Sequence, residues 1–197
     1  MSLLTNMQDC KWRPQRRMVI NESPYTGRRQ HGTLRFHRWE FSVQYATTRG
    51  ATALAKRAAL AALKGGDVAF NFRDPSLATP QSGYLGTALV NGTPTGYTVT
   101  LKNVTNNTLI VKAGDYFSVE YSSGKWQLFS AAADATSNGS GLVSITTHQP
   151  IRGTLTDGST VKVKDWFVTV TLDGNEEFDI DRRGNLILPP LRFVEDF

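Results

Sequence analysis

The sequence predicts a mainly β protein with one helix, in which a sheet-plus-helix domain is interrupted by a small β domain. Three observations support this class. Apolar residues alternate along several segments near both ends of the chain. One Ala/Leu-rich stretch carries the start and stop signals of a helix. Between them, residues 82–160 are dense in Gly, Thr, Ser and Asn, with recurring turn dipeptides that are typical of short strands.

The first expected elements are two strands separated by a turn. Residues 18–20 form a short apolar run, and residues 23–27 have the Pro and Gly placement of a turn. Apolar residues alternate again over residues 34–45, but their phase changes partway along. We therefore expect one strand with a bulge or bend near His37 and Arg38.

The only predicted helix covers residues 47–64. Thr47 or Thr48 is the expected N-cap, and Gly65 with its following glycine is the expected stop. The many small side chains predict a helix that lies close against a sheet. The expected stripe on one face, flanked by Leu60 and Leu63, contains Leu54, Ala58, Ala61 and Ala62.

Strand patterns follow the helix and return near the end of the chain. Residues 67–72 place three apolar side chains on one side, and residues 166–172 alternate strictly. Residues 178–180 and 186–188 are expected to pair as a hairpin through a turn at residues 183–185.

These patterns predict two domains. Residues 1–81 and 166–197 share an aromatic and β-branched character, so we expect them to form one sheet-plus-helix domain. Residues 82–165 are expected to form a small β-barrel domain inserted into a loop, a placement that folded domains tolerate.

Charge is distributed unevenly along the 197 residues. The whole chain carries a formal charge of +5, but residues 1–64 hold 12 basic and 3 acidic side chains, whereas residues 65–197 hold 10 and 14. No apolar run approaches the ~20 residues of a membrane-spanning helix, so no membrane contact is expected. Charged residues interrupt the first fourteen positions, so we expect no secretory signal.

No recognisable catalytic, cofactor or metal motif occurs, and we therefore expect no enzyme activity, no cofactor and no metal. The nucleophile-elbow, zinc-protease and phosphate-loop patterns are missing. The single Cys10 and three His residues argue against a disulfide framework or a zinc site. The acidic stretch 173–181 fails the EF-hand pattern, because Phe178 occupies the position that needs Gly. This stretch is better interpreted as a solvated or partner-facing edge.

Arginines interleaved with aromatic residues over residues 16–39 are typical of a nucleic-acid surface. However, the aromatic residues alternate as core residues do, and the rest of the chain carries a compensating negative charge. Arginine also suits protein interfaces, where its guanidinium pairs with carboxylates. A protein interface is therefore favoured over a specific nucleic-acid site.

Taken in order, a set of short motifs resembles the distal tail proteins of long-tailed (siphovirus) bacteriophages. The N-terminal set comprises residues 12–14, residues 23–30 with Trp39-Glu40, the Ala/Leu helix ending in Lys64-Gly65-Gly66, and residues 70–75. The insert set comprises residues 90–92, 109–117, 133–141 and 150–152. Each motif is weak alone, but together they cover nearly the whole chain in the same order.

The resemblance implies a virion structural protein of the tail tip, made in the host cytoplasm. Family members form a six-membered ring that meets the tail tube protein on one face and the tail hub or baseplate protein on the other. In members with this insertion, the second domain is similar to an oligosaccharide/oligonucleotide-binding (OB) barrel. That barrel type binds sugars or nucleic acid, but the fold alone establishes neither activity.

A closed ring needs a patch on one subunit that meets a different patch on the next. We therefore expect the basic segment of one subunit to face the acidic segment of its neighbour. The predicted interface residues are Arg28, Arg29, Arg35 and Arg38 on one side, and Asp173, Glu176, Glu177, Asp179 and Asp181 on the other.

Two alternatives stay open from the sequence. A carbohydrate-binding tail accessory would present exposed aromatic side chains, for which Tyr97, Tyr121 and Trp126 are the candidates. A nucleic-acid-binding module would bind DNA with an affinity that falls steeply with salt.

Overall fold

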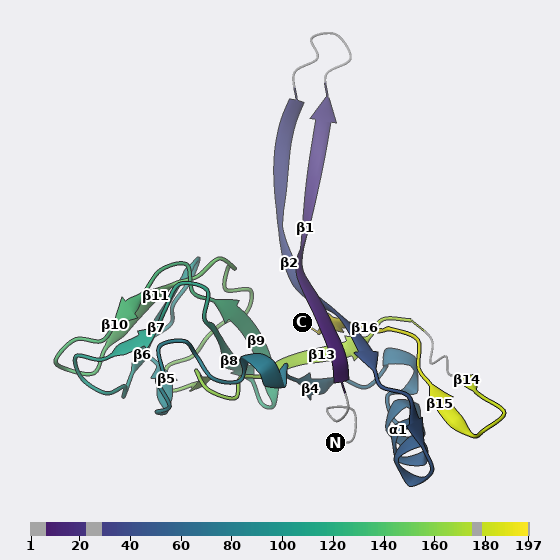
Figure 1. The fold of residues 1–197 in the computed structure, drawn as a ribbon. Coiled ribbons are helices and arrows are strands. Elements are labelled where there is room, and N and C mark those ends of the chain that lie inside the picture. The colour runs from purple at the N-terminus through teal and green to yellow at the C-terminus, as the bar shows by residue number, and fades with distance from the viewer. Residues whose placement is uncertain (1–6, 23–28, 175–178, 197) are drawn as a thin grey trace.

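The computed structural model describes residues 7–22, 29–174 and 179–196. The protein is mainly β, and α1 is the one α-helix in these ranges, as predicted. Figure 1 shows three parts: a β lobe on the left, a sheet with the helix on the right, and a long hairpin rising between them.

One antiparallel sheet unites the two ends of the chain. Its strand order is β1-β2-β16-β13-β4. The five strands are β1 (Met7–Glu22), β2 (Arg29–Tyr45), β4 (Phe70–Phe72), β13 (Val168–Leu172) and β16 (Leu191–Glu195). Because β16 pairs with both β2 and β13, the C-terminal strands lie at the centre of this sheet and β1 and β4 form its edges.

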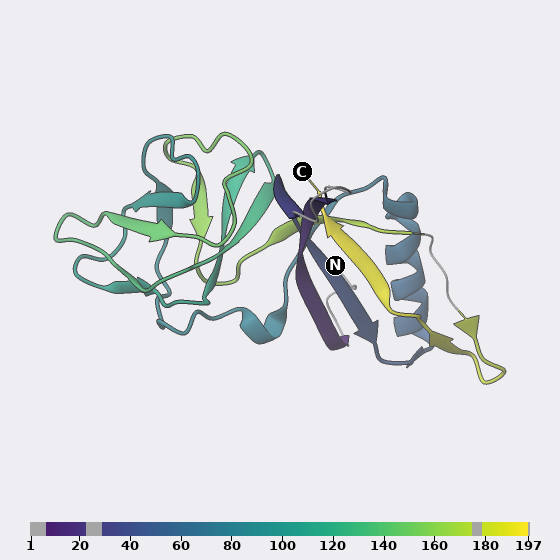
Figure 2. The same cartoon turned by 90° about the horizontal axis from the view of Figure 1, so that it is seen from above.

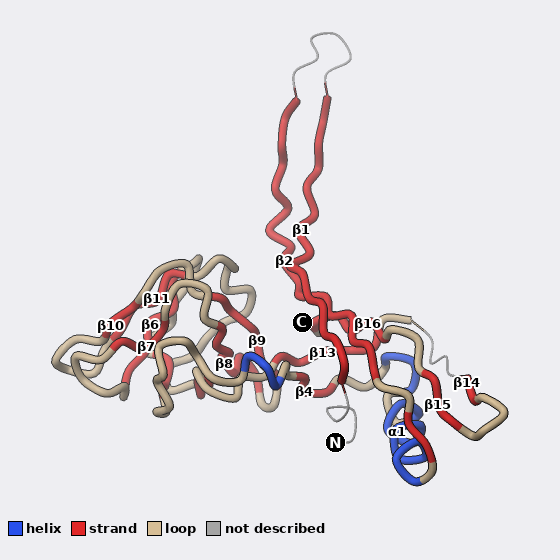
Figure 3. The backbone as a smooth tube through the Cα atoms, in the orientation of Figure 1, coloured by secondary structure: helices blue, strands red, loops and turns tan. Residues whose placement is uncertain are grey.

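Strands β1 and β2 pair from Met7↔Tyr45 to Glu22↔Arg29 and extend well beyond the sheet. We call the distal part of this hairpin, residues 16–22 and 29–37, the arm (Figures 1 and 3). The register shifts where the pair Arg16↔His37 is followed by Met18↔Thr33. This irregularity lies close to the predicted bend. The turn predicted at residues 23–27 falls outside the described residues.

The helix is shorter than predicted. Helix α1 covers Ala51–Ala61, its N-cap is Gly50 with φ 61°, and a 3₁₀ turn follows at Lys64–Gly66. Thr48 is not a cap, because Thr48–Arg49 form strand β3 and pair with the later strand β15 (Asn185–Ile187). This long-range pairing delays the start of the helix, and Gly50 tolerates the positive φ at the break.

The predicted helix face is also wrong. Ala53, Lys56 and Leu60 face the protein interior, whereas Leu54 is 64% exposed. Because alanines occur on every side of the helix, the sequence does not define one apolar face clearly. Packing against the sheet then selects the face that carries Leu60. Figure 2 shows the helix lying alongside β16.

A small three-stranded sheet lies beyond the helix. Its order is β14-β15-β3, with β14 (Asp179–Ile180) and β15 (Asn185–Ile187) forming the predicted hairpin. Residues 181–184 form the turn, and Gly184 has φ 76°. Residues 175–178 at its entry lie outside the described ranges.

The β lobe contains a six-stranded antiparallel sheet in the order β11-β6-β5-β12-β8-β9 and a separate pair, β7 with β10. A bridge between Ala131 and Thr147 joins the outer strands, so the sheet curls into a small barrel. Because OB folds have five strands, the OB-like assignment is not confirmed. The strands are β5 (Ala88–Val90), β6 (Thr98–Lys102), β7 (Leu109–Val111), β8 (Tyr116–Ser122), β9 (Lys125–Ser130), β10 (Ala135–Thr136), β11 (Val143–Thr146) and β12 (Thr160–Lys162).

Two hydrophobic cores lie on either side of the predicted boundaries. One gathers buried residues from positions 39–72 and 166–193, together with Leu128, and the other gathers residues from positions 84–163. Strand β9 packs against β13, where the Trp126 backbone N–H donates to Thr169 Oγ1 at 2.8 Å. Thr169 is consequently buried although it occupies a polar position in the alternating pattern. A second 3₁₀ turn, Pro75–Leu77, leads from β4 into the insert.

Candidate functional site

The predicted basic residues lie on the hairpin. Arg29, Arg35 and Arg38 all belong to β2, where Arg29 pairs with Glu22 and Arg38 pairs with Gln15. Arg28 lies outside the described residues. The structure thus places the described members of this group along one strand of the projecting hairpin.

The predicted acidic residues lie at the opposite end of the same domain. Asp173 is exposed just after β13, Asp179 is exposed on β14, and Glu176 and Glu177 lie outside the described residues. Asp181 bonds within its own hairpin: its carboxylate accepts from the backbone N–H groups of Arg183 and Asn185, both at 2.8 Å. These bonds, chiefly that from the Asn185 backbone, hold the pKa of Asp181 below its usual range.

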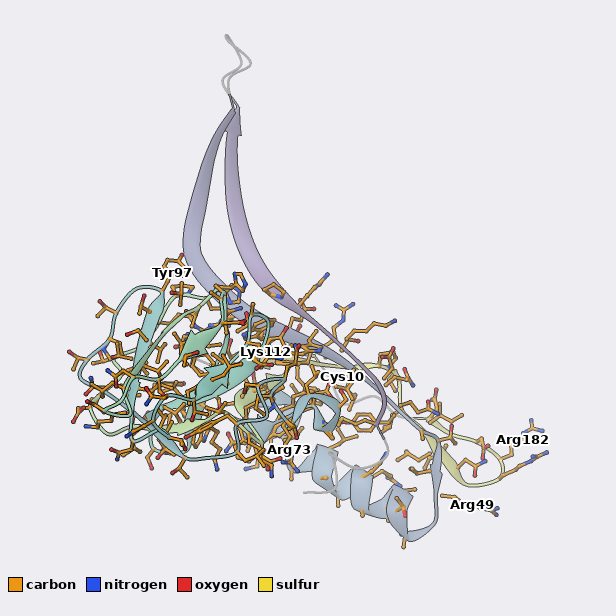
Figure 4. The ribbon with its side chains drawn as sticks, turned by 60° about the vertical axis from the view of Figure 1, so that its left-hand side comes forward. Cys10, Arg49, Arg73, Tyr97, Lys112 and Arg182 are labelled. Carbon is orange, nitrogen blue, oxygen red and sulfur yellow. The ribbon has the colours of Figure 1, made fainter. Side chains whose placement is uncertain are left out.

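Within one chain the two groups do not meet. The arm rises from one side of the sheet and the β14–β15 hairpin lies at the other side (Figure 1). Cations also surround the hairpin, since Arg49 and Arg182 extend outward at its tip (Figure 4). The hairpin tip therefore carries charges of both signs and is not a uniformly acidic surface.

The three aromatic candidates for carbohydrate contact lie in different environments. Tyr97 is 55% exposed at a corner of the insert (Figure 4). Tyr121 is half-buried, and its hydroxyl donates to the Asp196 carbonyl at 3.4 Å. Trp126 is only 7% exposed and packs edge-on against Phe167. The expectation of an exposed aromatic side chain is therefore wrong for Trp126, because the packing of the insert on β13 buries it.

A groove that sequence analysis did not anticipate lies at the junction of the hairpin and the insert. Its volume is about 390 Å³. Three aromatic and three polar side chains dominate its lining: Trp12, Trp39, Tyr116, Ser130, His148 and Gln149. We call it the junction groove. A single site is therefore assembled from the base of the hairpin and from two separate parts of the insert.

The aromatic wall of the junction groove is one continuous cluster. The Trp12 ring centroid lies 4.3 Å from that of Tyr116 and 5.3 Å from that of Trp39. Trp39 is buried, and its indole N–H donates to the Leu128 carbonyl at 3.1 Å. Trp12 and Tyr116 are only half-buried. Among the described residues, neither the Trp12 indole N–H nor the Tyr116 hydroxyl has a hydrogen-bond partner.

The polar wall is rigid. Gln149 is buried, its Oε1 accepts from the Ser130 backbone N–H at 2.7 Å, and its Nε2 donates to Ser130 Oγ at 3.0 Å. Thr147 Oγ1 donates to the Gln149 carbonyl at 2.7 Å. His148, between them, is exposed. The amide is therefore held in one orientation, with its second Nε2 hydrogen left for another acceptor.

Two further ionisable groups of the sheet domain lie away from the groove, Cys10 against the margin of the core and Lys56 within it. Burial raises the pKa of the Cys10 thiol to about 12, and the nearby Asp74 and Asp9 carboxylates act in the same direction. Lys56 is fully buried on α1, with its Nζ 4.6 Å from the centre of the Tyr45 ring. In the described ranges, no group of three His, Cys, Asp or Glu side chains is arranged to hold a metal ion.

Comparison with known proteins adds no assignment. The chain matches no protein-family model and no curated protein sequence. In the part of the chain that the structure describes, no helix has the length and apolar character needed to cross a membrane.

Proposed function

We propose that this protein is a structural component of a phage tail tip, where six copies form a ring that joins the tail tube to the hub or baseplate. The observation that carries the proposal is the five-stranded sheet with the long strand β1 at one edge and β4 at the other. Two different edges on one sheet suit the head-to-tail contacts of a closed ring. The ordered motifs shared with distal tail proteins supply the biological setting.

Sheet continuation is the expected mode of contact. Strands β2 and β13 are interior strands, so they do not themselves offer an edge to a neighbour. The unpaired backbone groups of an edge strand pair readily with another strand. We therefore assign the subunit contact to the β1 edge of one copy and the β4 side of the next. The protein acts as a passive adaptor with an open lumen, and no catalysis is required.

Charge sets the register of this contact. The arm of one copy, with Arg29 and Arg35, approaches the acidic end of the next copy, where Asp173 follows β13 and Asp179 lies on β14. Such rim charges contribute more to register and association rate than to affinity. The separation of the two groups within one chain is compatible with contact between different copies.

Negative-stain imaging and analytical ultracentrifugation of the purified chain test the proposal. Rings of six copies are expected at low salt, alone or after addition of the tail tube protein. Reversing Arg29, Arg35 and Arg38 to Glu should abolish them, because like charges would then face each other at every interface. Adding Asp173→Lys and Asp179→Lys to the same chain should restore rings, because every interface then regains opposite charges.

A matched control places the same change in charge elsewhere. Lys112, Lys125 and Lys164 are exposed and lie off both the arm and the β14–β15 hairpin, so their reversal to Glu should leave rings intact. Monomers under all conditions would reject the ring. Rings that survive the arm reversal would reject the charge contact while retaining the ring.

A further inference from the structure

The junction groove has the volume and the mixed aromatic and polar lining that small-molecule sites use. Its volume of about 390 Å³ lies within the usual range for small-molecule sites, about 300–1,000 Å³. Such sites combine aromatic walls with a few fixed polar groups, and both are present here.

The aromatic groups offer both a stacking surface and hydrogen bonds. Trp12 and Tyr116 are half-buried, so part of each ring system faces solvent. Their polar atoms differ from those of the two neighbouring tryptophans, since Trp39 and Trp166 donate their indole N–H groups to backbone carbonyls. Burial raises the pKa of Tyr116, so its hydroxyl remains a donor at neutral pH. A ligand with an apolar face and polar edges would satisfy both residues.

The remaining groups match hydroxyls. The two ring nitrogens of a histidine such as His148 can form hydrogen bonds, and the Tyr116 hydroxyl both donates and accepts. The Gln149 amide, which also lines the groove, is fixed by Ser130 and keeps one Nε2 hydrogen beyond these bonds. Hydroxyl groups donate and accept in the same way, whereas peptide carbonyls only accept.

The charge of the lining narrows the ligand class. No Lys, Arg, Asp or Glu side chain lines the groove. Phosphate groups are recognised mainly by Lys and Arg, so nucleic acid does not suit this surface. The nearby Arg13 is already paired with Glu40, at 3.0 Å. The fitting ligand is neutral, ring-shaped and hydroxylated.

We propose that the junction groove binds a neutral saccharide, with one pyranose ring packed against the exposed part of the Trp12–Tyr116 pair and its hydroxyls bonded to Tyr116, His148 and Gln149. This site differs from the aromatic candidates of the sequence. It joins the hairpin to the insert, so sugar binding would also bridge the two parts of the chain.

The full-length protein tests this inference with defined probes. Glucose, galactose, mannose, N-acetylglucosamine, maltose, cellobiose and lactose are titrated to about 10 mM, a range suited to weak binding. Saturation-transfer NMR and tryptophan fluorescence report contact. We expect at least one sugar to saturate, with its apolar ring face nearest the protein.

Two conservative variants locate the site. Tyr116→Phe removes only the hydroxyl, and His148→Ala changes an exposed side chain whose backbone N–H bond to Ser130 is retained. Each should weaken binding about fivefold, the value of one neutral hydrogen bond. Tyr97→Ala removes an exposed aromatic side chain elsewhere in the insert and should leave the affinity unchanged. Circular dichroism confirms that each variant folds.

The proposal is overturned if no probe binds at 10 mM, if a proline-rich peptide binds where no sugar does, or if binding survives both groove variants. Loss of binding on Tyr97→Ala alone would place the sugar elsewhere and also overturn it. Monomeric protein that binds sugar would leave this inference intact even where the ring is rejected.

Discussion

Arg152 of the insert forms a buried ion pair with Glu195 of β16. The Glu195 side chain is fully buried and that of Arg152 is 10% exposed. Glu195 also accepts backbone hydrogen bonds from Trp39 at 3.0 Å and from Leu128 at 3.4 Å. Burial raises the pKa of Glu195, while Arg152 and these backbone bonds oppose the rise. One carboxylate therefore ties together two strands of the sheet and two segments of the insert.

Breaking this pair should destabilise the protein strongly. Arg152→Met or Glu195→Gln leaves one buried group without its counterpart, which costs about 3–5 kcal/mol of unfolding free energy. The double variant should be destabilised by less than the sum of the two single variants, because it leaves no unpaired charge. Urea unfolding of the four proteins measures the coupling.

The exposed pair of Lys125 with Asp196, at 3.1 Å, is the matched control. Lys125→Met should cost less than about 1 kcal/mol, as surface ion pairs usually do. Additive losses for Arg152 and Glu195 would show that their pairing does not stabilise the junction.

Lys56→Met should increase stability at neutral pH by about 1 kcal/mol, because a buried ammonium without a hydrogen-bond partner in the described structure is removed and the aliphatic stem is kept. Burial lowers the pKa of Lys56 below its ordinary 10.5. The unfolded chain therefore binds more protons between these two pKa values, and this group makes stability rise with pH there. The variant should lack that rise.

The pH dependence of stability must be compared between Lys56→Met and the unaltered protein, because other groups titrate over the same pH range. Burial raises the pKa of Tyr116, and burial likewise raises the pKa of Cys10 to about 12. These acids lower stability as the pH increases through their unfolded values, equally in both proteins. Urea unfolding from pH 7 to 10 isolates the contribution of Lys56, and the exposed Lys64→Met is the control. An unchanged pH slope would refute the prediction.

Cys10 should be nearly inert to iodoacetamide in the folded protein. Because burial raises the pKa of its thiol to about 12, the reactive thiolate is scarce at pH 8. Alkylation should be more than about tenfold slower than in urea. In a Cys10→Ser/Ser123→Cys variant, the exposed turn thiol should react at the same rate folded or unfolded. Rapid folded-state labelling of Cys10 would contradict its burial.

Gly66→Ala should destabilise the protein by at least about 2 kcal/mol. Gly66 has φ 101°, and an added Cβ would overlap the Leu172 carbonyl oxygen. Gly65 has φ 63° but open space around it, so Gly65→Ala should cost only the conformational penalty of about 1 kcal/mol. Thermal unfolding ranks the two, and equal losses would show that the close approach to β13 is unimportant.

Local patterns predicted the elements whose signals lie within a few residues. The alternation over residues 166–172 indicated β13, and the recurring turn dipeptides of residues 82–160 indicated short strands, of which β8 and β9 join through Ser123-Gly124. The helix was predicted with the wrong ends and the wrong buried face. Its start depends on the pairing of Thr48 with Leu186, a contact between residues far apart in the chain.

In the candidate sites, too, local signals were predictable from the sequence and contacts between distant segments were not. Trp12 and Tyr116 stand in recognisable motifs, yet no spacing rule places them 4.3 Å apart. The exposure expected for Trp126 was wrong because β13 covers it. A side chain's partner across domains depends on how whole sheets dock, and alternation along one strand carries no information on that docking.

The sequence by itself determined the mainly β class with one helix, because strand and helix periodicities and turn residues are local properties of the chain. Only the tertiary structure decided that Glu195 pairs with Arg152, that β1 is an edge, and that three distant segments enclose the junction groove. Each of these depends on burying apolar surface between elements remote in sequence, which is a property of the assembled fold.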